Sequence, residues 1–449
     1  MSVRQPREMI LGAYISYGTG HHPAAWRMDR SCADAAQNID HYTSLVQHAE
    51  DNLFDFIFLS DTPSVFADDH LGYGSRVVVF EPLTFLAAMA VQTRHIGLIA
   101  TSSTSYKEPF NLAREYASLD WISGGRAGWN LVTSSKAGAA VNFGHAPHAE
   151  HEARYDRAGE FFDLTCRFWD SWEDDAFPRD KASGLFYDPA KRHPVHFEGQ
   201  HFRIAGGLLN IARPVQGRPV IVQAGASATG RDFAARHAEL VFTASGSIED
   251  AREFYRDVKA RAARHGRDPD QLKILPGCSP YCGPTADHGR RKLQDLQDKV
   301  APGLALSMLS DLLGGFDLSP YDIDGPLPPL PPSNGNQSRR AMIEKLAAQQ
   351  GTTIRSLYER LVVARGHFMA IGSYQDIADE LVEWVATGAA DGFNIMPPQM
   401  PDFLHDFSQG VIPLLQRAGW FKQAYRTGTL RDKLGLDRPR HPRARASVE

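Results

Sequence analysis

Hydrogen-bonding side chains follow several short apolar runs of this 449-residue chain, and their types limit the chemistry they support. One such run, RAGWNLVT, has these side chains crowded at its end: Asn130, Thr133, Ser134 and Ser135. Another is followed by QAGAS, which contains Gly225 and Ser227. A glycine that lets a ligand approach the backbone, next to a helix N-terminus, favours a phosphate group. This second run therefore predicts a phosphate-binding corner.

Two adjacent histidines, His21 and His22, follow the first apolar run after Gly18 and Gly20. Histidine titrates near neutrality and can donate a proton to a reacting oxygen. We expect His21 or His22 to be a catalytic proton donor, and the alternative is a solvent-exposed loop pair. His367, which precedes a short apolar run, is a weaker candidate for the same role.

Apolar runs that alternate with segments of helical period predict the fold that positions these groups. Strands are expected at residues 9–16, 54–61, 96–103, 126–133, 219–225, 238–244, 272–280 and 391–398. Strands interleaved with helices indicate a parallel sheet. The leading interpretation is α/β: one closed (β/α)8 TIM barrel with insertions, spanning residues 1–449 as a single domain. The carboxyl ends of its strands would gather the polar groups into one site.

Residues 109–133 are predicted to form a helix, a tight turn and a strand. Leu112, Tyr116 and Leu119 recur at helical spacing and mark one apolar face. Gly124 and Gly125 follow, and we expect them to end the helix in a left-handed conformation. The strand that comes next carries Asn130, so we expect this side chain near the active end of the barrel.

Three insertions and a tail interrupt the regular pattern. Residues 136–150 read as a polar loop, and residues 174–214 as an insertion with a hairpin that turns at Gly199. Residues 302–340 are irregular and rich in proline around 326–332, which excludes regular helix or central strand there. We interpret this segment as a lid over the site, with a surface connection as the alternative. From about residue 421 the tail is basic, and residues 438–449 are expected to fray.

Composition excludes several classes of function. The net charge of −5 provides no basic surface for nucleic acid. No apolar run reaches the roughly 18 residues that a membrane span requires, and residues 9–17 are too short for a secretory signal, so we expect a cytoplasmic protein. Four cysteines in so long a chain do not indicate a disulfide framework.

The usual metal and nucleotide motifs are also missing from the sequence. Cys278 and Cys282 lack a second ligand pair, and no HxH cluster follows the first strand, so no metal site is predicted and a metal-dependent hydrolase is disfavoured. GASATG is followed by Arg231 and Asp232 instead of the residues of a phosphate loop, and no GxGxxG motif follows a strand. A Rossmann domain for NAD(P)H is therefore not supported.

Six segments carry a resemblance to a known family. They are SGGRAGWNLVTS (123–134), ATSSTSYKEPFNLAR (100–114), NFG (142–144), HEARYDRAGEF (151–161), QAGAS (223–227) and ADGFNIMPP (390–398). In this order the chain resembles the bacterial luciferase-like flavin monooxygenases, in the subgroup of nitrilotriacetate, EDTA and dibenzothiophene-sulfone monooxygenases. The resemblance implies a barrel of the bacterial luciferase type and leaves the substrate open.

The resemblance also implies a set of cofactor contacts. Carried over residue by residue, it places His151, Tyr155, Gly225 and Ser227 at the phosphate of FMN. It places Asp61, Thr101 and Asn130 along the flavin. The alternative for His151 and Tyr155 is the polar face of an amphipathic helix. The alternative for the other three is hydrogen bonding to loop backbone.

The activity implied by the resemblance is that of an FMNH2-dependent monooxygenase. A separate NAD(P)H:FMN reductase supplies reduced FMN, which reacts with O2 to a flavin hydroperoxide that oxidises a small organic substrate. Such chemistry requires the exclusion of water, and aromatic side chains available for this are Tyr14, Phe58, Trp129 and Phe242. A homodimer or homotetramer is expected. The alternatives are a deazaflavin-dependent oxidoreductase of the same fold and a flavin-binding protein without catalysis.

Overall fold

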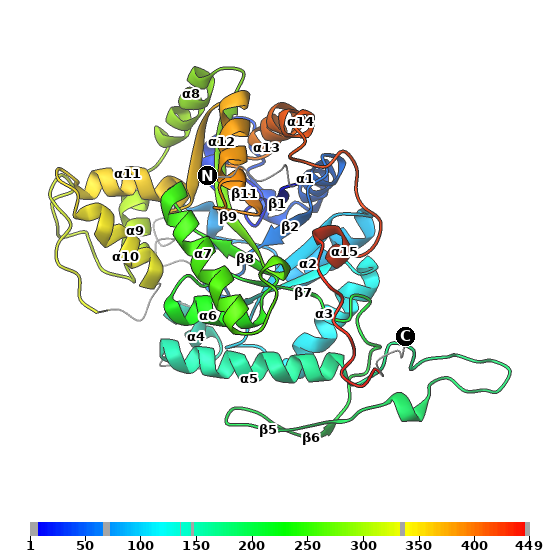
Figure 1. Cartoon of the computed structure of the whole chain (residues 1–449). Helices are drawn as coiled ribbons and strands as arrows, with labels where there is room; N and C mark the ends of the chain where they lie inside the picture. The colour runs from blue at the N-terminus through cyan, green and yellow to red at the C-terminus, as the bar shows by residue number, and fades with distance from the viewer. Residues whose placement is uncertain (1–7, 66–71, 135, 145–147, 333–336, 445–449) are drawn as a thin grey trace.

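A closed barrel of eight parallel strands forms the centre of the computed structural model, which describes residues 8–65, 72–134, 136–144, 148–332 and 337–444 (Figure 1). Its strands are β1 (Ile10–Tyr14), β2 (Phe56–Leu59), β3 (Gly97–Ser103), β4 (Ala127–Val132), β7 (Val220–Gln223), β8 (Leu240–Thr243), β9 (Lys273–Gly283) and β11 (Gly392–Ile395). They pair in this order, and β11 closes the ring on β1. The predicted barrel and all eight predicted strands are confirmed.

Helices cover the outside of the barrel. They are α1 (Ile39–Asp51), α2 (Pro82–Gln92), α3 (Pro109–Ser123), α5 (His151–Trp169), α6 (Ala228–His237), α7 (Ile248–Arg264), α8 (Ala286–Gln297), α12 (Tyr374–Ala386), α13 (Asp402–Asp406) and α14 (Ile412–Arg417). The predicted turn between α3 and β4 is confirmed, because Gly124 caps α3 at φ 66° and ψ 41° and donates its N–H to the Asp120 carbonyl. The glycine accepts this conformation without the steric cost that a Cβ would add.

The inner faces of the strands change in character along the barrel axis. Near the amino ends they are apolar, and they pack against the short helix α15 (Leu430–Leu434) through Leu430, Leu434 and the following Leu436. The inner residues of this layer include Ile10, Phe56, Ile99, Val220, Leu240 and Leu275. Because side chains alternate along a strand, the next inner positions are Thr101, Asn130 and Asn394. The apolar core thus closes the amino end of the barrel, and the inner residues toward the carboxyl end are polar.

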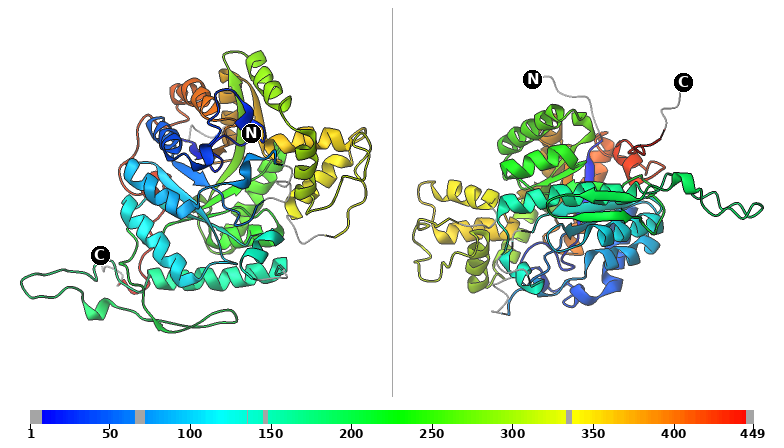
Figure 2. Two further views of the ribbon diagram at one scale, coloured as in Figure 1. Left: turned by 180° about the vertical axis from the view of Figure 1, so that it is seen from behind. Right: turned by 90° about the horizontal axis from the view of Figure 1, so that it is seen from below.

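The structure corrects the sequence interpretation of the irregular segments. The 136–150 segment contains a short helix, α4 (Ala137–Asn142), and the 302–340 segment contains α9 (Pro302–Leu312). With α10 (Gln337–Ala347) and α11 (Ile354–Ala364), α9 forms a small apolar core of its own. These three helices stand out on one side of the barrel (Figures 1 and 2). Ser135, residues 145–147 and residues 333–336 lie outside the described residues.

One further strand, β10 (Phe368–Ser373), was not expected from the sequence. It pairs with the carboxyl half of β9, outside the ring of eight. The predicted hairpin at Gly199 is confirmed as β5 (Val195–Glu198) and β6 (Arg203–Gly207). Its insertion extends from the side of the barrel opposite α9–α11 (Figure 2).

The expectation that residues 438–449 fray is wrong for the part that the structure describes. Arg438 pairs with Asp174 at 2.6 Å, and the buried His441 ring contacts the Asp170 carbonyl at 2.9 Å. The described part of the tail therefore runs along the base of the 174–214 insertion and plugs the amino end of the barrel through α15.

Candidate active site

Four of the residues predicted to bind phosphate meet between α5 and the loop that follows β7. Ser227 is the N-cap of α6, and its hydroxyl accepts the Gly230 N–H at 3.1 Å. The Ser227 hydroxyl also lies 3.4 Å from His151 Nε2, and the His151 and Tyr155 rings are 5.0 Å apart on successive turns of α5. A helix N-terminus flanked by a hydroxyl, an imidazole and a phenol is an arrangement that binds an anion well.

Glycine is required at position 225 because neighbouring side chains leave no space for a Cβ atom. A Cβ built on Gly225 would lie 2.6 Å from the Tyr155 hydroxyl and 2.4 Å from Gln223 Nε2. The Gly225 N–H donates to Gln223 Oε1 at 2.6 Å, so the side chain of Gln223 folds back over the turn. Burial raises the pKa of Tyr155, although hydrogen bonds to Gln223, Ser227 and Thr133 oppose the shift. Tyr155 is therefore a neutral hydrogen-bond donor at this corner.

Thr101 and Asn130 form a second group on the inner face of neighbouring strands. Asn130 Nδ2 donates to Thr101 Oγ1 at 2.8 Å, and Thr101 Oγ1 donates to the Leu59 carbonyl at 2.7 Å. The Asn130 Oδ1 atom is buried and has no hydrogen-bond partner among the described residues. A buried acceptor without a partner costs free energy, which is typical of a position that meets a ligand.

Asp61 points away from Thr101 and Asn130, because side chains alternate in direction along β2 and the residues that follow it. Phe56 and Phe58 face the inside of the barrel, so Ser60 continues the inner row and Asp61 turns outward. Burial raises the pKa of Asp61 to about 6, with Glu81 adding to the shift and Lys107 opposing it. Ser60 instead meets Tyr14, with 2.6 Å between the two hydroxyl oxygens. Sequence reasoning missed Ser60 because it gave more weight to the charged neighbour.

A cluster of aromatic rings, which we call the aromatic chamber, lies above the apolar layer at the carboxyl end of the barrel. Tyr14, Phe58 and Phe242 contact one another, with ring centroids 5.3 to 6.4 Å apart. His367 stacks on Phe242 at 5.1 Å, and His21 meets both Tyr14 and His367 edge-on. The structure therefore brings together three of the aromatic residues expected from the sequence, along with His21 and His367.

Trp129, the fourth aromatic residue named from the sequence, does not belong to this chamber. It faces the opposite side of β4 from Asn130 and packs in the outer core against Tyr116, Phe161 and Trp169. The alternation of side chains along the strand fixes this outcome, because adjacent residues cannot share a face.

The two histidines are buried, so the solvent-exposed alternative is wrong. The backbone N–H groups of His21 and His22 donate to the Pro397 and Pro398 carbonyls, which fixes both residues beside the end of β11. Burial and, to a lesser extent, the nearby Arg76 guanidinium lower the pKa of His22 to about 3. His22 is therefore neutral at physiological pH, which makes His21 the better placed of the two for proton donation through the ring that faces the chamber.

Two further polar residues at this end were not singled out from the sequence. Asn394 of β11 and Ser279 of β9 are buried, and both amide atoms of Asn394 and the Ser279 hydroxyl have no hydrogen-bond partner within the part of the chain that the structure describes. Asn394 lies in register with Gly12 and Gly277, two positions without side chains. An asparagine in an otherwise apolar strand (GFNI) was the available signal.

Positive charge flanks the chamber. The Arg76 guanidinium lies 4.4 Å above the ring of Tyr17, which itself packs against Tyr14. Burial alone would raise the pKa of Tyr17, but Arg76 and Arg365, together with hydrogen bonds to Tyr14 and Ser60, lower it. Arg365 follows α11 in a left-handed conformation at φ 51°, which is strained for a residue with a side chain. The two guanidinium groups make this side of the chamber suited to an anion.

Comparisons with known proteins decide the family. Residues 18–391 match the family described as luciferase-like monooxygenase. The chain belongs to this family. It is 44% identical to N-acetyl-S-(2-succino)cysteine monooxygenase of Bacillus subtilis (strain 168), covering 96% of this chain and 98% of that protein. It is also 44% identical to nitrilotriacetate monooxygenase component A of Aminobacter aminovorans, over 98% and 99% of the two chains.

A solved structure extends this similarity to the whole fold. Riboflavin lyase (RcaE), crystallised with modified FMN and riboflavin, superposes with a TM-score of 0.85 at 30% identity and covers 96% of this chain and 97% of its own. The resemblance predicted from the sequence motifs is confirmed, and the protein is a monooxygenase of a flavin-dependent family. None of the helices that the structure describes is long and apolar enough to cross a membrane.

Proposed function

We propose that this luciferase-like monooxygenase is the oxygenase component of a two-component system that uses reduced FMN. The observation that carries the proposal is the corner of His151, Tyr155, Gly225 and Ser227, which fits a phosphate. The buried amide oxygen of Asn130, which has no hydrogen-bond partner among the described residues, supports it. The phosphate distinguishes FMN from riboflavin, and the polar inner row from Thr101 to Asn394 meets the ring system. Asp61, which lies outside this row, is proposed as a further contact to the flavin.

The chemistry divides between cofactor and protein. Bound reduced FMN supplies the electrons that activate O2, so that one oxygen atom enters the substrate and the other leaves as water. The chain's own task is to hold the flavin, exclude water and provide a proton. Tyr14, Phe58 and Phe242 exclude water, and His21 holds the proton beside them. The buried polar groups are fixed in advance, which favours charge development without solvent reorganisation.

A separate reductase follows from the same proposal. The relative from Aminobacter aminovorans is named as component A, which denotes one part of a system with more than one protein. We propose that an NAD(P)H:FMN reductase supplies reduced FMN to this chain by the same division of labour. We also propose that the chain assembles into a homodimer or homotetramer.

The substrate class that we propose is a small organic acid. Arg76 and Arg365 place two positive charges at one side of the chamber, and both lower the pKa of Tyr17. The two relatives described above are named for N-acetyl-S-(2-succino)cysteine and for nitrilotriacetate, which carry carboxylates. A guanidinium pairs well with a carboxylate because its donors match the two oxygens.

The helices α9–α11 are proposed as the cover of the site. Asp311 on α9 pairs with Lys136, just after β4, at 3.0 Å and approaches Arg365 at 3.8 Å. These contacts attach the separate helical core at the carboxyl end of the barrel, where water must be excluded during turnover.

The test is a reconstituted reaction. The full chain is mixed with a generic NADH:FMN reductase, NADH, catalase and a panel of amino-polycarboxylates, sulfones and alkanes under 18O2, and products are weighed by mass spectrometry. We expect one 18O atom in a carboxylate-bearing product, dependent on FMN. Absence of labelled product across the panel, with reduced FMN shown to bind, would reject the substrate class, and failure of reduced FMN to bind would reject the proposal itself.

A further inference from the structure

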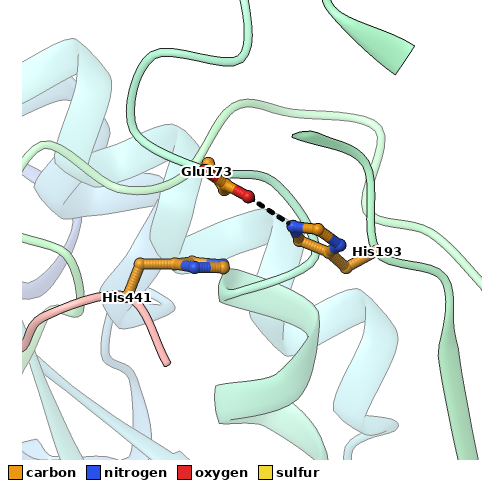
Figure 3. A group of neighbouring side chains, drawn as sticks. All are labelled: Glu173, His193 and His441. Atoms are coloured by element: carbon orange, nitrogen blue, oxygen red, sulfur yellow. Dashed lines mark hydrogen bonds and ion pairs between the residues drawn. The ribbon is translucent and has the colours of Figure 1, made fainter. Parts of the chain in front are cut away.

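Glu173, His193 and His441 form a cluster far from the active site. Glu173 and His193 belong to the 174–214 insertion and its entry, whereas His441 lies in the tail, 248 residues beyond His193 in the sequence (441 − 193). One possible ligand atom from each residue lies within 4.8 Å of the other two (Figure 3). Such convergence from distant segments brings together one carboxylate and two imidazoles, a donor set that divalent transition metals favour.

The hydrogen bonds of the cluster prepare it for a metal. His441 Nε2 donates to the Asp170 carbonyl at 2.9 Å, since a carbonyl only accepts, and this fixes the proton on Nε2. Nδ1 of His441 then carries a lone pair and accepts the Arg443 N–H at 3.2 Å. A histidine that ligates a metal usually gives its other ring N–H to a carbonyl or carboxylate in this way. The metal would replace the long bond from Arg443.

The Glu173 and His193 side chains complete the arrangement. Their Oε1 and Nε2 atoms are 2.8 Å apart, and the His193 and His441 rings lie 5.4 Å apart at 33° (Figure 3). Both side chains keep some exposure, 24% for Glu173 and 13% for His193, so an ion can enter from solvent. A tetrahedral ion with bonds of about 2.0–2.1 Å holds its ligand atoms roughly 3.3 Å apart, so a small rotation of these side chains is sufficient.

The guanidinium groups around the cluster are engaged by carboxylates other than Glu173. Arg213 and Arg218 lie nearby, but both pair with the buried Asp170, at 2.9 and 2.5 Å. Arg213 and Arg438 also share Asp174, at 2.9 and 2.6 Å. Three guanidinium groups thus share the two carboxylates of Asp170 and Asp174, and the Glu173 carboxylate pairs with His193.

We propose that Glu173, His193 and His441 bind one divalent transition metal ion, for which Zn2+ is the expected species, with water as the fourth ligand. The ion joins the C-terminal tail to the base of the insertion. α5 runs between the two regions, from His151 at the phosphate corner to Trp169 just before Glu173, and its 19 residues span roughly 28 Å. The role is therefore structural, and it revises the sequence-based expectation of no metal site.

The experiment uses the full chain, stripped with a chelator, desalted and titrated with Co2+ and Zn2+. We expect one equivalent of Co2+ with the absorption of a tetrahedral complex, displacement of Co2+ by Zn2+, and a melting temperature that rises with free metal concentration. Binding should weaken at acid pH, because protons compete with the metal for the ligand atoms.

Variants separate this site from the other histidines. His193→Ala and His441→Ala should each weaken binding more than the roughly 10- to 100-fold that loss of an outer contact causes. His196→Ala, on the exposed face of β5, should bind like wild type. If His441→Ala does not fold, Glu173→Gln serves instead, because glutamine keeps the size of the side chain and removes the charged ligand. Unchanged stoichiometry and affinity in the variants of Glu173, His193 and His441, or no tetrahedral absorption with wild type, would overturn the proposal.

Discussion

The two ends of the barrel are built on opposite principles. At the amino end, Leu430, Leu434 and Leu436 fill the barrel, and the buried Arg431 gives its guanidinium to Glu239 and to the carbonyls of Arg218 and Pro219. At the carboxyl end, buried polar atoms of Asn130, Ser279 and Asn394 have no partner among the described residues. One end is closed by its own chain, and the other keeps polar groups for a ligand. Stability and activity should therefore respond to different substitutions.

The largest expected effect on stability lies at the amino end. Leu430→Ala removes a fully buried side chain that packs against β2 and β3. We expect the free energy of unfolding to fall by about 2–5 kcal/mol, from lost burial and the cavity left behind. Urea unfolding measures this change, and anaerobic titration should show the same affinity for reduced FMN as wild type. A parallel loss of flavin affinity in protein that is still folded would remove the proposed separation of the two ends.

A pH effect of similar size is expected from His22 at the carboxyl end. Its pKa of about 3 in the folded chain lies below the value of about 6.5 in the unfolded chain. The unfolded state therefore binds more protons between these values, so stability is complete above pH 6.5 and falls as pH drops toward 3. The slope from this one group is about 1.4 kcal/mol per pH unit.

Comparison with His22→Gln isolates that slope, because all other titrating groups are shared. Denaturant unfolding between pH 4 and pH 7 should show a shallower dependence in the variant. Identical slopes in the two proteins would mean that His22 is not held neutral by burial.

Asn394→Leu tests the carboxyl end in the opposite sense. Replacing a buried amide that lacks a partner with an apolar side chain of similar size should leave the free energy of unfolding unchanged or raise it by about 1–2 kcal/mol. Product formation in the reconstituted reaction should fall at least tenfold, since the polar contact to the flavin or substrate is lost. A variant that is destabilised and fully active would show that Asn394 has a structural role.

The smallest effect is expected at the attachment of α9–α11. Asp311→Asn weakens the pair with Lys136, which is partly exposed and contributes about 1 kcal/mol or less. Stability should barely change, but a looser cover admits water, so the ratio of product to NADH consumed should fall about twofold while peroxide release rises. Asp317→Asn, on an exposed turn of the same region, is the control. Equal coupling in both variants would argue against a cover.

The same contrast explains what could be predicted from the sequence. Strands and helices follow from short-range periodicity. The eight strands of the ring and the left-handed Gly124 could therefore be predicted from the sequence. Contacts between distant segments leave no such local pattern. α15 closes the barrel from residue 430, and His441 lies close to Glu173, although both α15 and His441 belong to a tail whose composition is basic.

The candidate site could be predicted where its residues belong to a sequence motif. It was harder to predict where a shift of one residue changes which side chain points into the barrel. His151, Tyr155, Gly225 and Ser227 come together because α5 and the β7 loop are fixed by the barrel. Ser60 and Asp61, by contrast, are neighbours that directly follow β2, and only the structure shows which one meets Tyr14. β10 was missed because it pairs outside the ring, with an extension of β9 that the sequence does not mark.

The central claim is that the phosphate of FMN binds at the α6 N-terminus. Its most direct test is the ratio of the dissociation constants of reduced riboflavin and reduced FMN, measured anaerobically. We predict that the wild-type chain prefers reduced FMN by about 100-fold, as two or three charge-assisted hydrogen bonds provide. His151→Ala with Ser227→Ala should lower this ratio at least tenfold and leave riboflavin affinity unchanged, whereas Ser247→Ala, the matched N-cap of α7, should not. A ratio near one in the wild type, or the same ratio in all three proteins, would contradict the account.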